Sequence, residues 1–125
     1  MAYFNNKVVV ITGAGSGMGR SYAMEFARCG SRLALMDYDA TGLEKTVELV
    51  KAAANAEVLQ AVFSVADRTA MFAFADSVMQ RFGTVDVVIN NAGVAGAGLP
   101  GWDTSIEQIA AQSRVLQLAS QATRI

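Results

Sequence analysis

Short runs of apolar, mostly β-branched residues set the strongest limit on what this 125-residue chain can fold into. The runs are four to six residues long, as in Val8–Ile11 and Val85–Ile89. No run approaches the roughly 18 residues of a membrane-spanning helix. Runs of this length suit the strands of a parallel sheet that helices cover on both faces. A hydrophobic fraction of 53% against 17% charged residues agrees with such strands and excludes a disordered chain.

Segments with the helical spacing of apolar residues alternate with these runs. We expect strands at Lys7–Thr12, Arg32–Asp37, Glu57–Ser64 and Val85–Asn90, and helices at Met18–Cys29, Gly42–Ala54, Ala70–Phe82 and Thr104 to about Ala119. This order predicts an α/β fold of the Rossmann type, with about four parallel strands and helices on both faces. Residues 1–98 are expected to form this unit. A loop rich in Gly and Ala follows at Gly93–Gly101, and residues 99–125 form a divergent tail with one helix rather than a second domain.

Polar residues and glycines mark the ends of the expected helices. The capping box Thr41-x-x-Glu44 predicts where the second helix begins, and Thr104-x-x-Glu107 is a similar box for the last helix. Asp67 or Thr69 can cap the third helix, which Gly83 ends. Gly30 closes the first helix in a position that favours a left-handed residue.

The charged and reactive residues exclude several classes of function. The net charge of −1 offers no basic stripe for binding nucleic acid. The chain has no histidine, which excludes Ser-His-Asp and Cys-His nucleophiles and histidine-based metal sites. The single Cys29 fits a reducing compartment, and Met1–Lys7 does not resemble a secretion signal. We therefore expect a cytoplasmic protein that binds neither membrane nor metal.

Four glycines alternate with other residues between the first strand and the first helix, in the segment Thr12-Gly13-Ala14-Gly15-Ser16-Gly17-Met18-Gly19. Glycine lets the backbone turn tightly and lets a phosphate approach it closely. The helix that follows directs its free N–H groups and the positive end of its dipole at that phosphate. A strand before the loop and a helix after it are the context that a dinucleotide-binding loop requires.

The spacing of these glycines narrows the class of loop. A G-x-G-x-x-G motif would need glycine where Met18 or Arg20 stands, and a P-loop would need a Gly-Lys-Ser/Thr sequence that is absent. The pattern present is T-G-x-x-x-G-x-G. It resembles the cofactor loop of the short-chain dehydrogenase/reductase family. The resemblance covers about residues 5–98 and implies an oxidoreductase with a nicotinamide cofactor.

Two further segments extend the resemblance. Asn90-Asn91-Ala92-Gly93 matches the family's NNAG motif after the fourth strand, where Asn91, Ala92 and Gly93 would line the cofactor. By resemblance, Asn91 helps to hold the adenosine half and the central strands. Ser64-Val65-Ala66-Asp67 stands where the family often has Asp-Val-x-Asp, whose first acid meets the adenine amino group. Ser64 departs from that pattern but can still accept a hydrogen bond, and Asp67 matches the second acid.

Asp37 indicates which dinucleotide the chain prefers. It ends the second strand, twenty residues after Gly17, where a carboxylate can accept hydrogen bonds from the adenosine ribose hydroxyls and repel a 2′-phosphate. Neither Ser16 nor Tyr38 is basic, so we expect NAD to be preferred over NADP. The full set of expected cofactor-binding residues is Gly13, Ser16, Gly17, Met18, Gly19, Asp37, Tyr38, Ser64, Val65, Asn91, Ala92 and Gly93.

The catalytic residues that the resemblance implies are absent from these 125 residues. The family uses Tyr-x-x-x-Lys with an upstream Ser, and an Asn on a helix after NNAG. Here no tyrosine follows Tyr38, no lysine follows Lys51 and no asparagine follows Asn91. We assign no catalytic residue and interpret Tyr3-x-x-x-Lys7, which precedes the first strand, as a coincidence.

Two interpretations of the function remain. One is the NAD(H)-binding part of a short-chain oxidoreductase acting on an alcohol or ketone, truncated and inactive as this chain. The other is a non-catalytic dinucleotide-binding or assembly module that works with another chain. Both leave the fourth strand at a bare sheet edge, which predicts a homo-oligomer or a partner chain that covers it.

Overall fold

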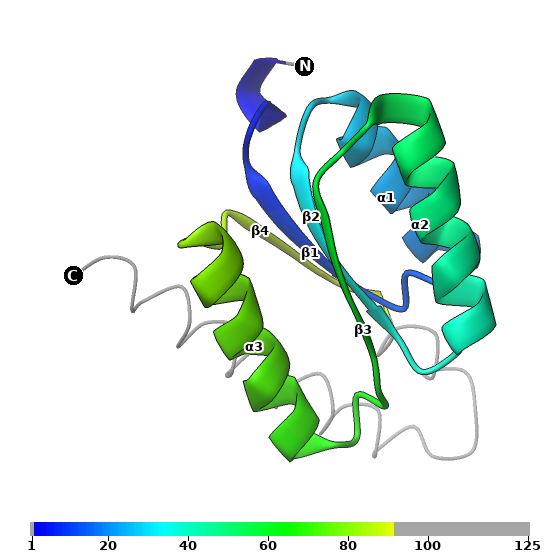
Figure 1. Cartoon of the computed structure of the whole chain (residues 1–125), viewed down its shortest axis with the longest axis vertical. Helices are drawn as coiled ribbons and strands as arrows, with labels where there is room; N and C mark the ends of the chain where they lie inside the picture. Colours follow the sequence, from blue (N-terminus) through cyan, green and yellow to red (C-terminus); the bar gives the residue numbers. More distant parts are fainter. Residues whose placement is uncertain (1, 92–125) are drawn as a thin grey trace.

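The computed structural model describes residues 2–91, which form a parallel sheet with helices on both faces (Figure 1). The elements are η1 (Ala2–Phe4), β1 (Val8–Thr12), α1 (Gly17–Arg28), β2 (Arg32–Asp37), α2 (Ala40–Ala54), β3 (Val58–Val62), α3 (Arg68–Phe82) and β4 (Val87–Asn90). The expected α/β fold is confirmed. The predicted loop Gly93–Gly101, the helix from Thr104 and the tail 99–125 lie outside the described residues.

The four strands follow the order β3-β2-β1-β4 and are all parallel. Val9 of β1 lies between Leu33 of β2 and Val87 of β4. The chain order reverses between β1 and β4, and ligands of open α/β sheets bind in the crevice at such a switch point. The central β1 is completely buried, whereas the outer β3 and β4 are only partly covered.

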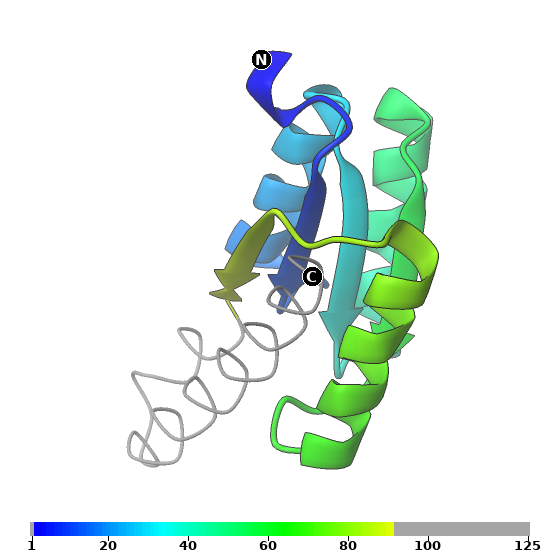
Figure 2. The same ribbon diagram turned by 90° about the vertical axis from the view of Figure 1, so that its left-hand side faces the viewer.

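Two apolar cores lie on opposite faces of the sheet. Val9 and Ile11 of β1 pack in the core beneath α1 and α2, whereas Val8 and Val10 pack in the core beneath α3. Figure 2 shows α3 on the face of the sheet opposite α1. The predicted apolar stripe of α3 is buried, namely Met71, Phe74, Val78 and Phe82. Because Val8, Val9, Val10 and Ile11 each pack in one of these helix-covered cores, this part of the strand is continuously apolar.

All three long helices begin one or two residues earlier than the sequence predicted, α1 at Gly17 instead of Met18. The capping box at Thr41 is wrong, because α2 begins at Ala40 and its N-cap is Asp39, whose carboxylate accepts a hydrogen bond from the Gly42 N–H at 3.2 Å. Asp39 has the extended backbone of a cap, which leaves Thr41 inside the first turn. The third helix begins at Arg68, two residues earlier than predicted, and Asp67 caps it through the Ala70 N–H at 3.0 Å.

The outer strands are shorter than the apolar runs that predicted them. Val85 is buried in the core beneath α3, but it precedes β4. Between them, Asp86 accepts a hydrogen bond from the Val8 N–H on its carboxylate at 2.8 Å. Past the end of β3, Ser64 forms a turn in which its carbonyl accepts from the Asp67 N–H at 2.9 Å. Glu57, Phe63 and Asp86 still form backbone hydrogen bonds with the neighbouring strands, although they lie outside β3 and β4.

Gly83 ends α3, as the sequence predicted, with a φ of +76°. Gly30, after α1, has the left-handed conformation predicted for it, with a φ of +83°. Within residues 2–91, no helix combines the length and the apolar character needed to cross a bilayer.

Candidate functional site

The candidate site lies at the carboxyl end of the sheet, where β1 passes through the glycine loop into α1. The ends of β2 and β4 flank it, because the two strands pair with β1 on either side. This end is opposite to the one that carries η1 and the chain start (Figure 1). The topology therefore gathers the loop, Asp37 and Asn91 from three separate stretches of sequence.

The glycines of the loop are required for two different reasons. Gly13 and Gly17 have φ values of +66° and +53°, a left-handed conformation that side chains disfavour. Among the described residues, no atom outside the neighbouring backbone lies within 4 Å of the place where a Cβ of Gly17 would be, so this position faces open space. Gly19 is the reverse case, because a Cβ there would overlap the carbonyl oxygen of Gly13 and approach Asn91 Nδ2. Gly17 leaves room for a ligand, whereas Gly19 allows α1 to pack against the end of β1.

The first turn of α1 differs from that of the other two long helices. Its N-cap Ser16 forms no capping hydrogen bond with its side chain. In α2 and α3 the carboxylates of Asp39 and Asp67 fill the equivalent place. The first N–H groups of a helix have no partner within the helix and carry a partial positive charge. The start of α1 is therefore suited to an anion such as a phosphate.

Asp37 is buried at the end of β2, with 7% of its surface exposed. Its Oδ2 accepts a hydrogen bond from the Gly15 N–H at 2.7 Å, and its Oδ1 accepts one from the Asp39 N–H at 2.9 Å. A carboxylate has about four acceptor positions, so each oxygen can still accept another bond. The carboxylate is thus oriented by two backbone groups and retains acceptor capacity for a ligand.

Two large apolar side chains, one after β2 and one at the start of α1, are exposed to solvent. Tyr38, next to Asp37 in the chain, is 79% exposed, and Met18 in the first turn of α1 is 61% exposed. By contrast, Val65 is partly buried against the core beneath α3. The Ser64 hydroxyl accepts a hydrogen bond from the Ala66 N–H at 3.1 Å, so the side chain helps to form the turn into α3.

Asn91 joins the end of β4 to the glycine loop. Its Nδ2 donates a hydrogen bond to the Gly13 carbonyl at 3.1 Å. This contact bridges residues 78 positions apart and fixes the loop against the switch point of the sheet. The expected contributions of Ala92 and Gly93 lie outside the described residues.

The sequence analysis did not identify Arg20 and Thr46, whose side chains hold the glycine loop by its backbone carbonyls. Arg20 donates from Nη2 to the Gly15 carbonyl at 2.7 Å, and Thr46 donates from Oγ1 to the Ala14 carbonyl at 2.7 Å. The motif alone marked Arg20 only as a place without glycine. One signal could have identified Arg20. It directly follows the last glycine of the motif and lies in the first turn of the expected helix.

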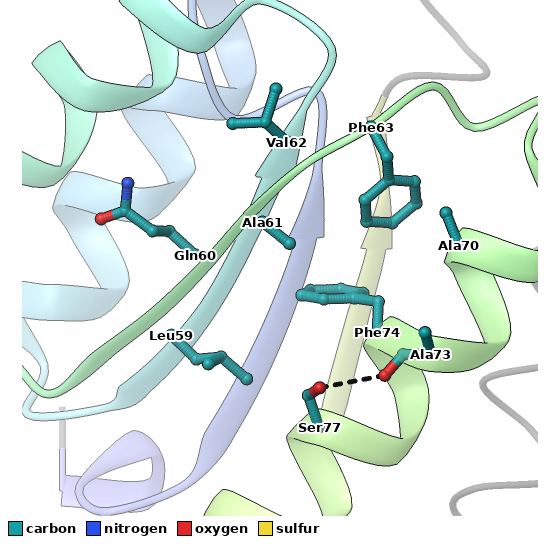
Figure 3. Close-up of a pocket in the computed structure, with 9 residues that line it drawn as sticks. All are labelled: Leu59, Gln60, Ala61, Val62, Phe63, Ala70, Ala73, Phe74 and Ser77. Atoms are coloured by element: carbon teal, nitrogen blue, oxygen red, sulfur yellow. Dashed lines mark hydrogen bonds between the residues drawn. The ribbon is translucent and has the colours of Figure 1, made fainter.

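A cavity of about 250 Å³ opens elsewhere, between β3 and α3 (Figure 3). Phe63 and Phe74 lie close together at its wall, with ring centroids 5.5 Å apart. Ser77 points its hydroxyl at the carbonyl of Ala73. None of the predicted cofactor-binding residues lines this cavity. Across residues 2–91 there is also no cluster of three acidic, cysteine or histidine side chains suited to a metal.

Comparison with known proteins identifies the family. The model of the short chain dehydrogenase family matches residues 7–119. SadH of Mycobacterium tuberculosis, named as an oxidoreductase, is 49% identical over 98 residues, which are 78% of this chain and 35% of SadH. The chain therefore belongs to the short-chain dehydrogenase/reductase family.

Solved structures agree with this assignment. A short-chain dehydrogenase/reductase from Burkholderia phymatum in complex with NAD has a TM-score of 0.76 at 31% identity, and the match covers 95% of this chain and 46% of that one. L-sorbose reductase from Gluconobacter frateurii complexed with NADPH and L-sorbose has a TM-score of 0.80 at 26% identity, covering 94% of this chain and 49% of that one. The chain thus spans between a third and a half of the length of these relatives.

Proposed function

We propose that this chain binds NAD(H) as the cofactor-binding part of a short-chain oxidoreductase, which transfers hydride between the nicotinamide and an alcohol or ketone. The observation that carries the proposal is the combination of two features at adjacent strand ends. The start of α1 has no side-chain cap, and the carboxylate of Asp37 is held beside it through Gly15. The uncapped start of α1 suits a pyrophosphate, and the Asp37 carboxylate suits a ribose.

The pyrophosphate is proposed to bind at Gly17, Met18 and Gly19, where α1 begins. Gly17 supports this placement because the space beside it is open. A phosphate oxygen can then approach the backbone and accept hydrogen bonds from the first N–H groups of the helix. Gly13 and Ser16 complete the proposed binding loop.

Asp37 is proposed to bind the adenosine ribose hydroxyls and to favour NAD over NADP. Its two backbone hydrogen bonds fix the carboxylate, so it cannot turn away from a 2′-phosphate without losing them. Neither Ser16 nor Tyr38 supplies a positive charge to compensate that phosphate. Family membership does not decide this preference, because the related structures contain NAD in one case and NADPH in the other.

The remaining proposed contacts surround the adenosine half of the cofactor. Tyr38, Ser64 and Val65 are proposed to line the adenine, and Asn91, Ala92 and Gly93 to line the cofactor from the end of β4. Support for Tyr38 is its exposed ring next to Asp37. Support for Asn91 is its hydrogen bond to the glycine loop.

We propose that these 125 residues do not transfer hydride by themselves. The family's Tyr-x-x-x-Lys pair has no counterpart after the glycine loop. Tyr3 and Lys7 do contact each other, with Lys7 Nζ 5.3 Å from the ring centroid, but they precede β1, at the end of the sheet opposite the loop. A turnover assay with NAD and secondary alcohols should detect no reaction. Measurable turnover would mean that another residue acts as the acid or base.

A non-catalytic module that works with a partner chain is the alternative function. One observation favours it: among residues 2–91, β4 pairs with β1 on one side only, and its Val88 is 36% exposed. Such an edge can pair with another chain. Cofactor binding is common to both proposals, so it is the property to test first.

Calorimetric titration of the full chain with NADH and NADPH tests the binding proposal. We expect NADH to bind at least about 10-fold more tightly, because a 2′-phosphate would lie against the fixed carboxylate. Asp37→Ala should weaken NADH binding and remove the preference, and Gly17→Val should abolish binding. Asp76→Ala, an exposed acid on α3, is the matched control and should change neither affinity. Equal or tighter NADPH binding by the unmodified chain would refute the role given to Asp37.

A further inference from the structure

Arg20 lies in the first turn of α1, and its guanidinium forms three hydrogen bonds, one with the glycine loop and two with α2. Its Nη2 donates to the carbonyls of Gly15 at 2.7 Å and Gly42 at 3.1 Å. Its Nε donates to Thr46 Oγ1 at 2.9 Å. The guanidinium thus connects the loop to the first turns of α2. Each of these acceptors is a neutral oxygen.

Thr46 continues this connection to the preceding residue of the loop. It is completely buried, and its hydroxyl donates to the Ala14 carbonyl at 2.7 Å while accepting from Arg20. A hydroxyl has one proton, so a longer contact of 3.2 Å to the Gly42 carbonyl competes for it. Two successive carbonyls of the loop, those of Ala14 and Gly15, are therefore held from the same side. We call Arg20 and Thr46 the loop clamp.

The loop clamp acts on Asp37 through the peptide between Ala14 and Gly15. The carbonyl of this peptide accepts from Thr46, and its N–H donates to Asp37 Oδ2 at 2.7 Å. In a trans peptide the two groups point in opposite directions, so the two bonds fix the peptide plane. In the next peptide Arg20 holds the carbonyl of Gly15, which directs the Ser16 N–H away from the guanidinium.

The charge of Arg20 has no carboxylate partner among the described residues. The ion pairs found in residues 2–91 are Arg28 with Glu25 and Arg81 with Glu57. An arginine keeps its positive charge at any physiological pH. A charge that is bonded only to neutral oxygens stays available to an anion bound at the neighbouring loop.

We propose that Arg20 is a positioning residue for the dinucleotide, which with Thr46 holds the glycine loop and the Asp37 carboxylate in their binding arrangement before the cofactor arrives. A preorganised loop binds more tightly because less ordering is needed on binding. The proposal rests on the proposed function for its affinity measurement. The arrangement of the loop can be measured independently without cofactor.

The test compares the unmodified chain with Arg20→Met, Arg20→Lys and Thr46→Val. Arg28→Met is the matched control, because Arg28 is an exposed arginine on the same helix that contacts Glu25. We expect Arg20→Met to weaken NADH binding about 10-fold. Arg20→Lys keeps the positive charge but loses the planar guanidinium that donates to several acceptors. Its NADH affinity should therefore lie between those of Arg20→Met and the unmodified chain. Arg28→Met should leave the affinity unchanged.

Amide hydrogen exchange without cofactor supplies the second readout. In Arg20→Met and Thr46→Val, exchange at the Gly15 N–H should rise about 10-fold, while Val10 in the centre of β1 keeps its protection. The double variant should lose little more than either single variant, because both act on one unit. Unchanged Gly15 exchange, additive effects or an equal rise at Val10 would overturn the proposal. If the unmodified chain does not bind NADH, the proposed function fails and the exchange at Gly15 still decides the loop clamp.

Discussion

Alanine at Gly19 should destabilise the protein, although helix propensity predicts the opposite. Gly19 lies inside α1, where replacing glycine by alanine normally gains about 1 kcal/mol. Here a Cβ would overlap the Gly13 carbonyl oxygen and lie 2.7 Å from the Gly13 carbonyl carbon. Both atoms are backbone, so relief requires α1 to move away from the loop. Overpacking of this kind costs about 1–3 kcal/mol and sometimes more.

Gly17→Ala and Gly83→Ala separate crowding from backbone strain. Both glycines have positive φ, +53° and +76°, and within residues 2–91 no atom beyond the adjacent backbone lies within 4 Å of the added Cβ. Each alanine should cost about 1–2 kcal/mol through its left-handed conformation alone. Gly83 ends α3, outside the proposed site, and therefore calibrates this cost. Of these two variants, only Gly17→Ala should also weaken NADH binding.

Thermal unfolding followed by circular dichroism measures the three variants. At about 4 °C for each kcal/mol, Gly17→Ala and Gly83→Ala should lower Tm by similar amounts of about 4–8 °C. Gly19→Ala should lower Tm by about 4–12 °C, or prevent folding in a domain whose whole stability is about 5–15 kcal/mol. An unchanged or raised Tm for Gly19→Ala would refute the close packing of α1 against the end of β1. Equal NADH affinity in Gly17→Ala and Gly83→Ala would refute the ligand space at Gly17.

Three further predictions concern the fold and its edges. Asp67→Ala removes the cap of α3 and should cost about 1 kcal/mol in urea unfolding, with no change in NADH affinity. Phe74→Ala opens the core beneath α3 and should cost about 3–5 kcal/mol, and a loss below about 1 kcal/mol would contradict the packing of that helix. Sedimentation velocity should find an oligomer if a second copy covers the edge of β4, and a stable, cooperatively unfolding monomer would contradict that prediction.

The sequence alone determined the fold class and the position of the glycine loop. Strong local patterns carry this information, because a buried parallel strand reads as a continuous apolar run and a phosphate-binding turn needs glycine. Asp67 and Gly83 were recognised for the same reason, since a cap acts within one turn of its own helix. At the start of α2 the sequence prediction was wrong, because it placed the capping box at Thr41 whereas the N-cap is Asp39. The choice depended on which residue had extended backbone after β2.

Tertiary structure decided what holds the loop in place. The bond from Gly15 to Asp37 joins residues 22 apart, and that from Arg20 to Thr46 joins residues 26 apart. No spacing rule relates such positions, because their distance depends on how α1, α2 and β2 pack together. The length of 125 residues and the motifs predicted a cofactor-binding unit. Only the packed fold showed that the carboxylate, the loop and a half-buried arginine form one hydrogen-bonded network, because such a network exists only after distant segments meet.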